Sequence, residues 1–354
     1  MAYRCTKERD SGIGHRSRRL TRWSYGRLMA AEAGGLSLAG ALKSAPLDLP
    51  SNLRYSGDAV ARLRLAGLTL AYDMAGQGIP LVFIHQVGTD RRLWREQRAL
   101  LAGQYLMITV DVLGHGELRW PLEAVSIRRA AVYVQRLLKQ LLTEGAFLIG
   151  VSMGAAVAMQ LALLAPSSVR GLILVSPWRR IGGYTKSLLE RLFRLAEAGN
   201  MAAHTDLFFR YAFPPACLER RMPEVERLRV IALHQDSRAV SYAWAACLAA
   251  DAADEAGEIG SPSLVIAGLN DLLTPPYLAQ EVAKGLTKVE LEVWHATGHF
   301  PLLEDPVRFN RRLKMFVRRH VTRPPPGGNG SVNSRTGKRE VPDGDSDGAR
   351  GFLP

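Results

Sequence analysis

Residues 147–156 read Phe147-Leu148-Ile149-Gly150-Val151-Ser152-Met153-Gly154-Ala155-Ala156. An apolar run typical of a buried strand ends at Gly150, and a helix-like run to Leu164 begins directly after Ser152. Between them lies the pattern Gly-X-Ser-X-Gly, which is typical of a serine held on a sharp strand-to-helix turn with its hydroxyl exposed. The residues two positions to either side of the serine must be small, so that strand and helix can approach each other. The stretch therefore predicts an α/β arrangement centred on Ser152.

Apolar runs alternate with helical patterns on both sides of this stretch. We expect strands at 63–65, 68–72, 81–84, 106–110, 171–175, 263–267 and 289–293, and helices at 91–101, 126–142, 277–286 and 306–320. Ser126 is expected to cap its helix. The alternation predicts an α/β fold whose sheet is mostly parallel, has about eight strands and is flanked by helices. Ligands bind to such a sheet where loops leave the carboxyl ends of the strands.

The alternation stops between residues 178 and 258, where only helical patterns occur, at 186–198, 201–211 and 240–253. We expect a helical cap at 178–258, inserted after the sixth strand. The core is then expected to consist of residues 61–177 and 259–320. A basic N-terminal extension (1–60) and a Pro/Gly/Ser-rich charged tail (321–354) are both expected to be disordered.

Composition narrows the class of protein. The chain has 354 residues, of which 47% are hydrophobic, enough for one large domain with an insertion. Its three cysteines are odd in number and widely spaced, which fits neither a disulfide framework nor a zinc pattern and favours a reducing, cytoplasmic location. No apolar run reaches the roughly 18 residues of a membrane span. Arg16-Ser17-Arg18-Arg19-Leu20-Thr21, before a weakly apolar segment, leaves export by a twin-arginine signal open, as it leaves open a translation start at Met29.

The charge of the chain is concentrated near its start. The formal net charge is +13, and eight Lys/Arg stand against two Asp/Glu between Met1 and Leu28. A basic chain can bind nucleic acid or anionic lipid non-specifically. No aromatic-interleaved basic stripe, zinc finger or helix-turn-helix makes such binding specific. We expect a small-molecule ligand and no specific nucleic-acid partner, with binding through the tails as an alternative; oligomeric state is not predicted.

Two residues that follow later strands can serve Ser152. Asp271 comes just past an apolar strand, and His299 lies past the last strand in a Gly-His-Phe-Pro turn. A serine hydroxyl needs a base in contact with it, and the base needs an orienting acid, so we expect Ser152, Asp271 and His299 to act together. The N–H groups of Met153 and Val87 are expected to form an oxyanion hole. Each residue alone has a plain alternative: Asp271 could be a helix cap, His299 a surface loop histidine and Ser152 a small residue at a tight turn.

The other histidines favour a structural role over a metal site. His295 and His299 lie four residues apart, but in a glycine-containing loop with no carboxylate at ligand spacing, so neither a metal nor another cofactor is expected. His85 and His115 are expected to shape the loops around the site, and Asp111 is expected to hold its own turn.

Three residues are candidates for contact with a substrate. Gln86 lies in the first loop, while Trp178 and Arg179 open the cap. An arginine at this position can hold a substrate carboxylate through two hydrogen bonds. The alternative is an arginine that faces solvent in an arginine-rich protein.

The segment from Leu63 to Val317, about 70% of the chain, resembles the α/β-hydrolase superfamily, in the branch of capped esterases, lactonases and peroxidase-like hydrolases. Five motifs carry the resemblance: His85-Gln86-Val87-Gly88, Asp111-Val112-Leu113-Gly114-His115-Gly116, Gly150-Val151-Ser152-Met153-Gly154, Gly268-Leu269-Asn270-Asp271 and Gly298-His299. The resemblance implies a serine hydrolase that cleaves a small carboxylic ester or lactone through an acyl-enzyme. A carbamate or amide hydrolase, and a ligand-binding member of the fold with little turnover, are the alternatives.

Within that branch the motifs point in two directions. Val87-Gly88-Thr89-Asp90 resembles the 3-oxoadipate enol-lactonases, whereas the cap opening Trp178-Arg179-Arg180-Ile181 is similar to the aminoacrylate hydrolases of pyrimidine breakdown. Gln86 replaces a glycine that is usual in the family, and Glu117-Leu118 replaces the usual X-Ser after Gly116. Both departures lie in the first two loops, which line the substrate pocket in this family. The motifs therefore do not identify the substrate. Ser152 also excludes relatives with a carboxylate nucleophile.

Overall fold

The computed structural model describes residues 61–65, 68–112, 114–117, 125–142, 144–250 and 256–321. The N-terminal extension expected at 1–60, with its candidate export signal, lies outside the described residues, as does the expected tail beyond residue 321. Within the described part of the chain, no helix is long and apolar enough to cross a membrane.

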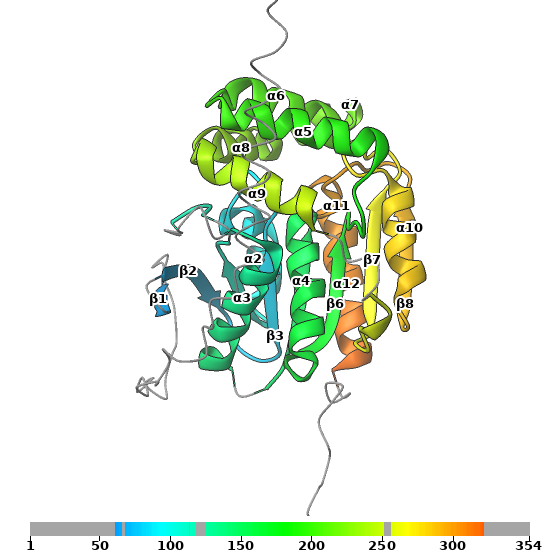
Figure 1. Cartoon of the computed structure of the whole chain (residues 1–354). Coiled ribbons are helices and arrows are strands. Elements are labelled where there is room, and N and C mark those ends of the chain that lie inside the picture. Colours follow the sequence, from blue (N-terminus) through cyan, green and yellow to red (C-terminus); the bar gives the residue numbers. More distant parts are fainter. Residues whose placement is uncertain are drawn as a thin grey trace, which may run out of the picture.

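One eight-stranded sheet runs through the centre of the molecule (Figure 1). Its strands lie in the order β1 (Ala61–Leu65), β2 (Leu68–Ala75), β4 (Leu106–Val110), β3 (Pro80–Ile84), β5 (Ala146–Val151), β6 (Val169–Val175), β7 (Ser263–Gly268) and β8 (Val289–Trp294). β2 is antiparallel to both β1 and β4, and all other neighbours are parallel. The predicted α/β fold with a mostly parallel sheet is confirmed.

The register aligns the carboxyl ends of the central strands. Ile84 of β3 lies beside Val110 of β4 and Gly150 of β5, and Val151 lies beside Val175 of β6. The central strands are apolar runs buried on both faces, as expected for parallel strands covered by helices. Consequently the loops that follow these strands begin at one edge of the sheet.

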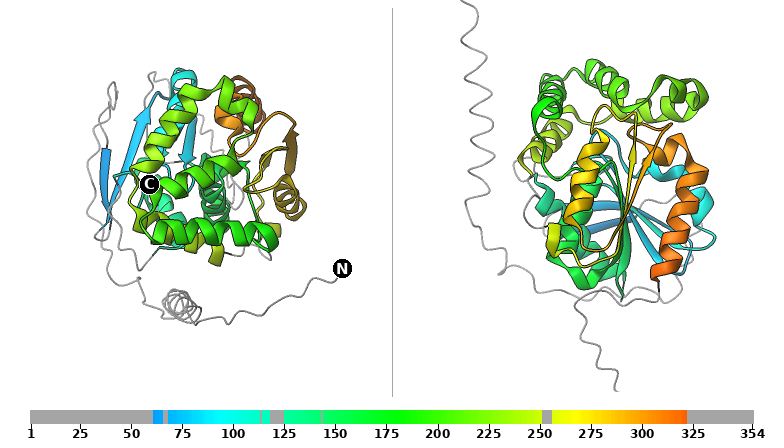
Figure 2. Two further views of the ribbon diagram at one scale, coloured as in Figure 1. Left: turned by 90° about the horizontal axis from the view of Figure 1, so that it is seen from above. Right: turned by 90° about the vertical axis from the view of Figure 1, so that its right-hand side faces the viewer.

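Helices cover both faces of the sheet (Figure 2). α3 (Ile127–Leu141), α4 (Met153–Leu164) and α10 (Pro276–Gly285) lie on one face. The short 3₁₀ turn η2 (Arg91–Trp94), α2 (Arg95–Leu101) and α12 (Pro306–His320) belong to the other face, where α12 packs against α2. The Ser126 hydroxyl accepts a hydrogen bond from the N–H of Arg129, so the expected cap of α3 is confirmed.

Five helices fill the chain between β6 and β7 and lie over one end of the sheet (Figure 1). They are α5 (Gly183–Glu197), α6 (Met201–Ala212), α7 (Pro215–Arg220), α8 (Met222–Leu233) and α9 (Ser237–Ala249), and we call them the helical layer. α9 begins three residues earlier than the sequence pattern predicts, because the Asp236 carboxylate caps the N–H groups of Arg238 and Ala239. The sequence pattern did not predict α7 or α8.

The first turn of α4 lies against the ends of β3 and β5 with no room for side chains. A Cβ on Gly154 would lie 2.1 Å from the carbonyl oxygen of Ile84, and one on Gly150 would lie 2.3 Å from that of Gly154. Ser152, between them, has φ 53° and ψ −115°, a conformation that is rare for residues other than glycine. The two glycines of the motif are therefore required by close packing of backbone on backbone.

Replacing Gly154 by alanine should destabilise the protein. The nearest obstacle is backbone, which cannot rotate away, so we expect Gly154→Ala to lower the free energy of unfolding by about 1–3 kcal/mol or more. Urea denaturation measures this change. The matched control is Gly103→Ala, because a Cβ on Gly103 meets nothing within 4 Å. Equal unfolding midpoints for the two variants would contradict the proposed packing constraint.

Candidate active site

Asp271 and His299 form a buried pair at the carboxyl edge of the sheet. Nδ1 of His299 lies 2.7 Å from Oδ2 of Asp271, and both side chains are completely buried. Oδ1 of Asp271 accepts hydrogen bonds from the N–H groups of Leu273 and Thr274, each at 2.9 Å, and Oδ2 accepts one from the Thr274 hydroxyl at 3.0 Å. These donors hold the carboxylate as an acceptor, so His299 carries its proton on Nδ1.

The second ring nitrogen of His299 is available for chemistry. Nε2 is buried and has no hydrogen-bond partner among the described residues. Because Nδ1 carries the proton, Nε2 presents a free lone pair. The ring packs edge-on against Phe208 of α6 and against Phe300, with centroid distances of 6.1 and 5.1 Å. Such an imidazole is oriented to accept a proton at Nε2.

Ser152 lies at the turn between β5 and α4 and is linked to the same loops through the end of β6. Its N–H donates to the carbonyl of Val175 at 2.9 Å. Ser176, the residue after Val175, has φ 46°, and its hydroxyl donates to the carbonyl of His299 at 3.1 Å. In the conformation described, Ser152 Oγ and His299 Nε2 are not hydrogen-bonded to each other. In free enzymes such catalytic contacts often tighten only when substrate binds.

Two backbone N–H groups near Ser152 have no acceptor within the part of the chain that the structure describes. Val87, in the loop after β3, and Met153, the first residue of α4, are both buried. Neither N–H donates a hydrogen bond to any described residue. The first loop turns at Gly88, where φ is +78°, and the Gly88 N–H donates to Nε2 of His115 at 2.9 Å. The structure thus leaves unpaired the two donors that the sequence predicts for an oxyanion hole.

Buried histidines connect the first loop, which follows β3, with the second loop, which follows β4, in the role the sequence predicts for them. Nε2 of His85 accepts the N–H of Val112 at 3.0 Å, and its Nδ1 lies 2.8 Å from the carbonyl of Gln86. Burial lowers the pKa of His85 to about 4. The ring is therefore neutral and can accept a hydrogen bond at physiological pH.

An ion cluster around the buried Arg91 connects the same two loops. The Arg91 guanidinium contacts Asp111 at 2.6 Å, Glu117 at 2.8 Å and Asp73 at 3.1 Å. Burial raises the pKa of Asp111 to about 6, against the opposing effect of Arg91. Asp111 also accepts the N–H groups of Arg91 and Glu117, so it holds its own turn, as the sequence predicts, and the first loop as well. The sequence analysis did not predict that Arg91 pairs with these three acidic residues.

Gln235 connects the helical layer to both loops. Its Nε2 donates to the carboxylate of Asp90 at 2.9 Å, and its Oε1 accepts the N–H of Gly116 at 3.0 Å. Gln235 lies between α8 and α9, far along the chain from Asp90 and Gly116. The three residues therefore meet only in the folded protein.

Glu304 holds the backbone on both sides of His299. This residue ends α11 (Pro301–Glu304), and its carboxylate accepts the N–H of Gly298 at 2.8 Å and that of Phe300 at 2.9 Å. Burial raises the pKa of Glu304 to about 7, although both N–H groups favour the carboxylate. Sequence analysis missed this residue; the available signal was an acid five positions after His299. On the other side of the loop, the N–H of His299 donates to the carbonyl of Ala212 in α6 at 2.7 Å.

The three candidate substrate-binding residues differ in their surroundings. Gln86 is buried, and its Oε1 has no hydrogen-bond partner among the described residues. Trp178 is buried at the start of the chain segment that leads into the helical layer. Arg179 is half-buried, with a buried Nε that has no partner among the described residues. Both Gln86 and Arg179 therefore retain hydrogen-bonding capacity that the protein itself does not use.

His295 does not join His299 in a metal site. It is exposed, and its carbonyl accepts the side-chain amide of Asn270 at 3.0 Å. Across the described ranges, no three His, Cys, Asp or Glu residues are grouped so that they could hold a metal ion.

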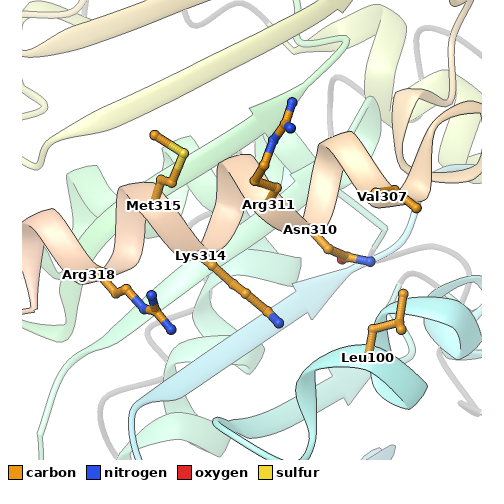
Figure 3. A pocket seen from close by; sticks show the side chains of 7 residues that line it. All are labelled: Leu100, Val307, Asn310, Arg311, Lys314, Met315 and Arg318. Atoms are coloured by element: carbon orange, nitrogen blue, oxygen red, sulfur yellow. The ribbon is translucent and has the colours of Figure 1, made fainter.

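A shallow groove lies elsewhere on the surface, between α2 and α12 (Figure 3). It has a volume of about 380 Å³, and Asn310 and Lys314 of α12 point toward Leu100 of α2. None of the candidate site residues lines it, so it is separate from the site at the carboxyl edge of the sheet.

Comparison with known proteins agrees with the fold. The model of one family, described as the alpha/beta hydrolase fold, matches residues 79–306. The chain is 26% identical over 249 residues to a putative carbamate hydrolase RutD of Azorhizobium caulinodans, covering 70% of this chain and 94% of that protein.

Two solved structures illustrate the likeness. The structure of Est816, described as an N-acyl homoserine lactone degrading enzyme, is 28% identical with a TM-score of 0.63, covering 73% of this chain and all of that one. An enol-lactonase from Burkholderia xenovorans LB400 is 24% identical with a TM-score of 0.68 and the same coverage, and at that identity it shows the fold alone.

The buried carboxyl of Glu304 should make stability depend on pH. Its pKa is raised from an ordinary 4.5 to about 7, so the stability it contributes is full below about pH 4.5 and is lost as pH rises through 7. We expect Glu304→Gln to abolish a fall of about 1–3 kcal/mol in the free energy of unfolding between pH 5 and pH 8. Urea denaturation at both pH values measures it. The control is Glu219→Gln, at an exposed position. If the pH dependence of stability in Glu304→Gln equals that of the wild-type protein, burial does not raise the pKa of Glu304.

Proposed function

The chain belongs to the α/β-hydrolase fold family, and from this premise we propose that it is a serine hydrolase that cleaves a small carboxylic ester or lactone. Fold alone does not fix the reaction, so the proposal rests on the site. The observation that carries it is the buried Asp271–His299 pair with a free Nε2, beside the strained turn that presents Ser152. This is the arrangement that acyl transfer to a serine requires.

The residues divide the reaction between them. Ser152 Oγ attacks the substrate carbonyl while His299 Nε2 takes the hydroxyl proton, and Asp271 stabilises the imidazolium that forms. The negative charge on the carbonyl oxygen is stabilised by the N–H groups of Val87 and Met153, neither of which donates to a described residue. His299 then protonates the leaving alcohol. In the second half of the reaction His299 activates water, which attacks the acyl-enzyme and releases the acid.

We expect the helical layer to act as a cap that decides which substrates reach Ser152. Arg179, with an unpaired Nε, supports a substrate that carries a carboxylate. The carbamate hydrolase RutD and the lactone-degrading Est816 are relatives above 25% identity. Their names favour hydrolysis of a carbamate as the second candidate function and support the lactone as a substrate; both reactions use the same serine mechanism.

Removal of the Ser152 hydroxyl tests the mechanism. We expect Ser152→Ala to lower kcat for a short-chain nitrophenyl ester by about 1,000-fold or more, because the proposed acyl-enzyme forms on this hydroxyl. The control is Ser187→Ala in α5, whose hydroxyl is exposed and is not among the candidate site residues. The free energy of unfolding of both variants is measured in parallel. Turnover of the Ser152→Ala variant equal to that of the wild-type protein would overturn the proposed function.

Arg179 is tested by comparing substrates of different charge. We expect Arg179→Gln to lower kcat/KM for monomethyl succinate, relative to the neutral methyl pentanoate, by about tenfold or more, the loss typical of one hydrogen bond to a charged group. The reaction is followed by acid release in a pH-stat. Arg180→Gln, a neighbouring exposed arginine, is the control. If both variants keep the wild-type ratio, Arg179 does not bind a substrate carboxylate.

A further inference from the structure

His204 of α6 lies where the helical layer faces the first loop. The side chain is buried, and a Cβ placed on Gly88 would lie 3.7 Å from its Cε1 atom. Its ring is parallel to that of Phe208, one turn further along α6, with a centroid distance of 6.4 Å. Phe208 in turn lies edge-on to His299. His204 therefore lies beside the first loop, which we call the oxyanion loop because it carries the Val87 N–H, and through Phe208 it lies beside the proposed base.

Trp244 of α9 fixes which nitrogen of His204 carries the proton. Its indole N–H donates to Nε2 of His204 at 2.8 Å, and an indole nitrogen can only donate. Nε2 must therefore be the unprotonated nitrogen. Burial lowers the pKa of His204 to about 4, so the ring is neutral at physiological pH and its single proton lies on Nδ1.

The Nδ1–H group of His204 meets no acceptor in the described ranges of the chain. Nδ1 is buried and unpartnered among the described residues. The other buried imidazoles differ: His85 and His115 have contacts at both ring nitrogens, and the free nitrogen of His299 is the acceptor that the proposed reaction needs. A buried donor without a partner is unfavourable and uncommon in native proteins. Its place next to the oxyanion loop indicates that the partner is supplied by the ligand.

We propose that the Nδ1–H of His204 donates a hydrogen bond to a second oxygen of the substrate, separate from the carbonyl that Ser152 attacks. The inference rests on the proposed serine-hydrolase function and narrows its substrate class to esters or lactones that carry an additional carbonyl, hydroxyl or carboxylate oxygen. A site built to hydrogen-bond such an oxygen discriminates against the analogue that lacks it, because the buried donor is then left unpaired.

Matched ester pairs test the proposal on both sides of the scissile bond. The acyl pair is the 4-nitrophenyl esters of 4-oxopentanoate and pentanoate, and the alcohol pair is acetonyl butanoate and propyl butanoate. In the wild-type protein we expect the oxygen-bearing member of one pair to be preferred in kcat/KM by about tenfold or more. The pair that shows the preference tells whether the second oxygen belongs to the acyl or to the alcohol part.

Substitutions of His204 separate hydrogen bonding from shape. His204→Phe keeps an aromatic ring but removes the donor, and we expect it to bring the preference close to one. His204→Asn places an amide N–H near the position of Nδ1 and should retain most of the preference, whereas His204→Gln places its amide near the position of Nε2 and should lose it. A purely structural role predicts the opposite order, with the phenylalanine variant closest to the wild-type protein. The exposed His234→Phe, also in the helical layer, is the matched control.

The outcomes distinguish the inference from the function on which it rests. Loss of preference in His204→Phe and His204→Gln, with retention in His204→Asn, supports the proposal. Hydrolysis without any preference in the wild-type protein, or a preference that survives in His204→Phe, overturns it and leaves the serine-hydrolase function standing. Failure of the wild-type protein to hydrolyse any of the four esters counts against the function and the inference together. Urea denaturation identifies a variant that fails to fold, in which case the remaining two decide.

Discussion

The backbone at Gly154 passes so close to the carbonyl of Ile84 that no side chain fits between them, and the site depends on that contact. It brings the N-terminus of α4 against the end of β3, so that the Met153 N–H lies near the first loop. The same packing forces Ser152 into its strained conformation, since strand must become helix within one residue. Close contact of three backbone segments therefore fixes both the turn that holds Ser152, which is buried, and the nearby donors.

Buried carboxylates and the end of α6 hold the loops around that turn. Asp111 fixes the first two loops through Arg91, and Glu304 fixes the backbone on both sides of His299. The last carbonyls of α6 complete the frame: that of Tyr211 accepts the N–H of Leu272 and that of Ala212 accepts the N–H of His299. Gly298 has no side chain because a Cβ there would lie 2.4 Å from the carbonyl of Ala212. The loops are thus rigid for reasons of hydrogen bonding as well as packing.

The sequence predicts the sheet well, because buried parallel strands are short apolar runs and the motif residues follow them directly. It also nominates Ser152, Asp271 and His299, since each lies just past a strand whose carboxyl end the topology places at the same edge. It could not predict Glu304 or Gln235, whose partners are backbone groups chosen by tertiary contact. For the same reason the pairing of His204 with Trp244 has no sequence signal: the residues lie 40 positions apart on two amphipathic helices.

The hydrogen bond from the His299 N–H to the end of α6 limits how the protein can evolve. The same helix carries His204, which faces the oxyanion loop, and Ala212, whose carbonyl positions the backbone of His299. A mutation that shifts α6 to accommodate a new substrate also displaces the base, so gains in selectivity there are coupled to losses in rate. The side chain of Gln86 is free of that coupling, because its Oε1 has no partner among the described residues. Substitution of Gln86 can therefore change substrate selectivity without displacing His299, whereas a shift of α6 changes selectivity and rate together.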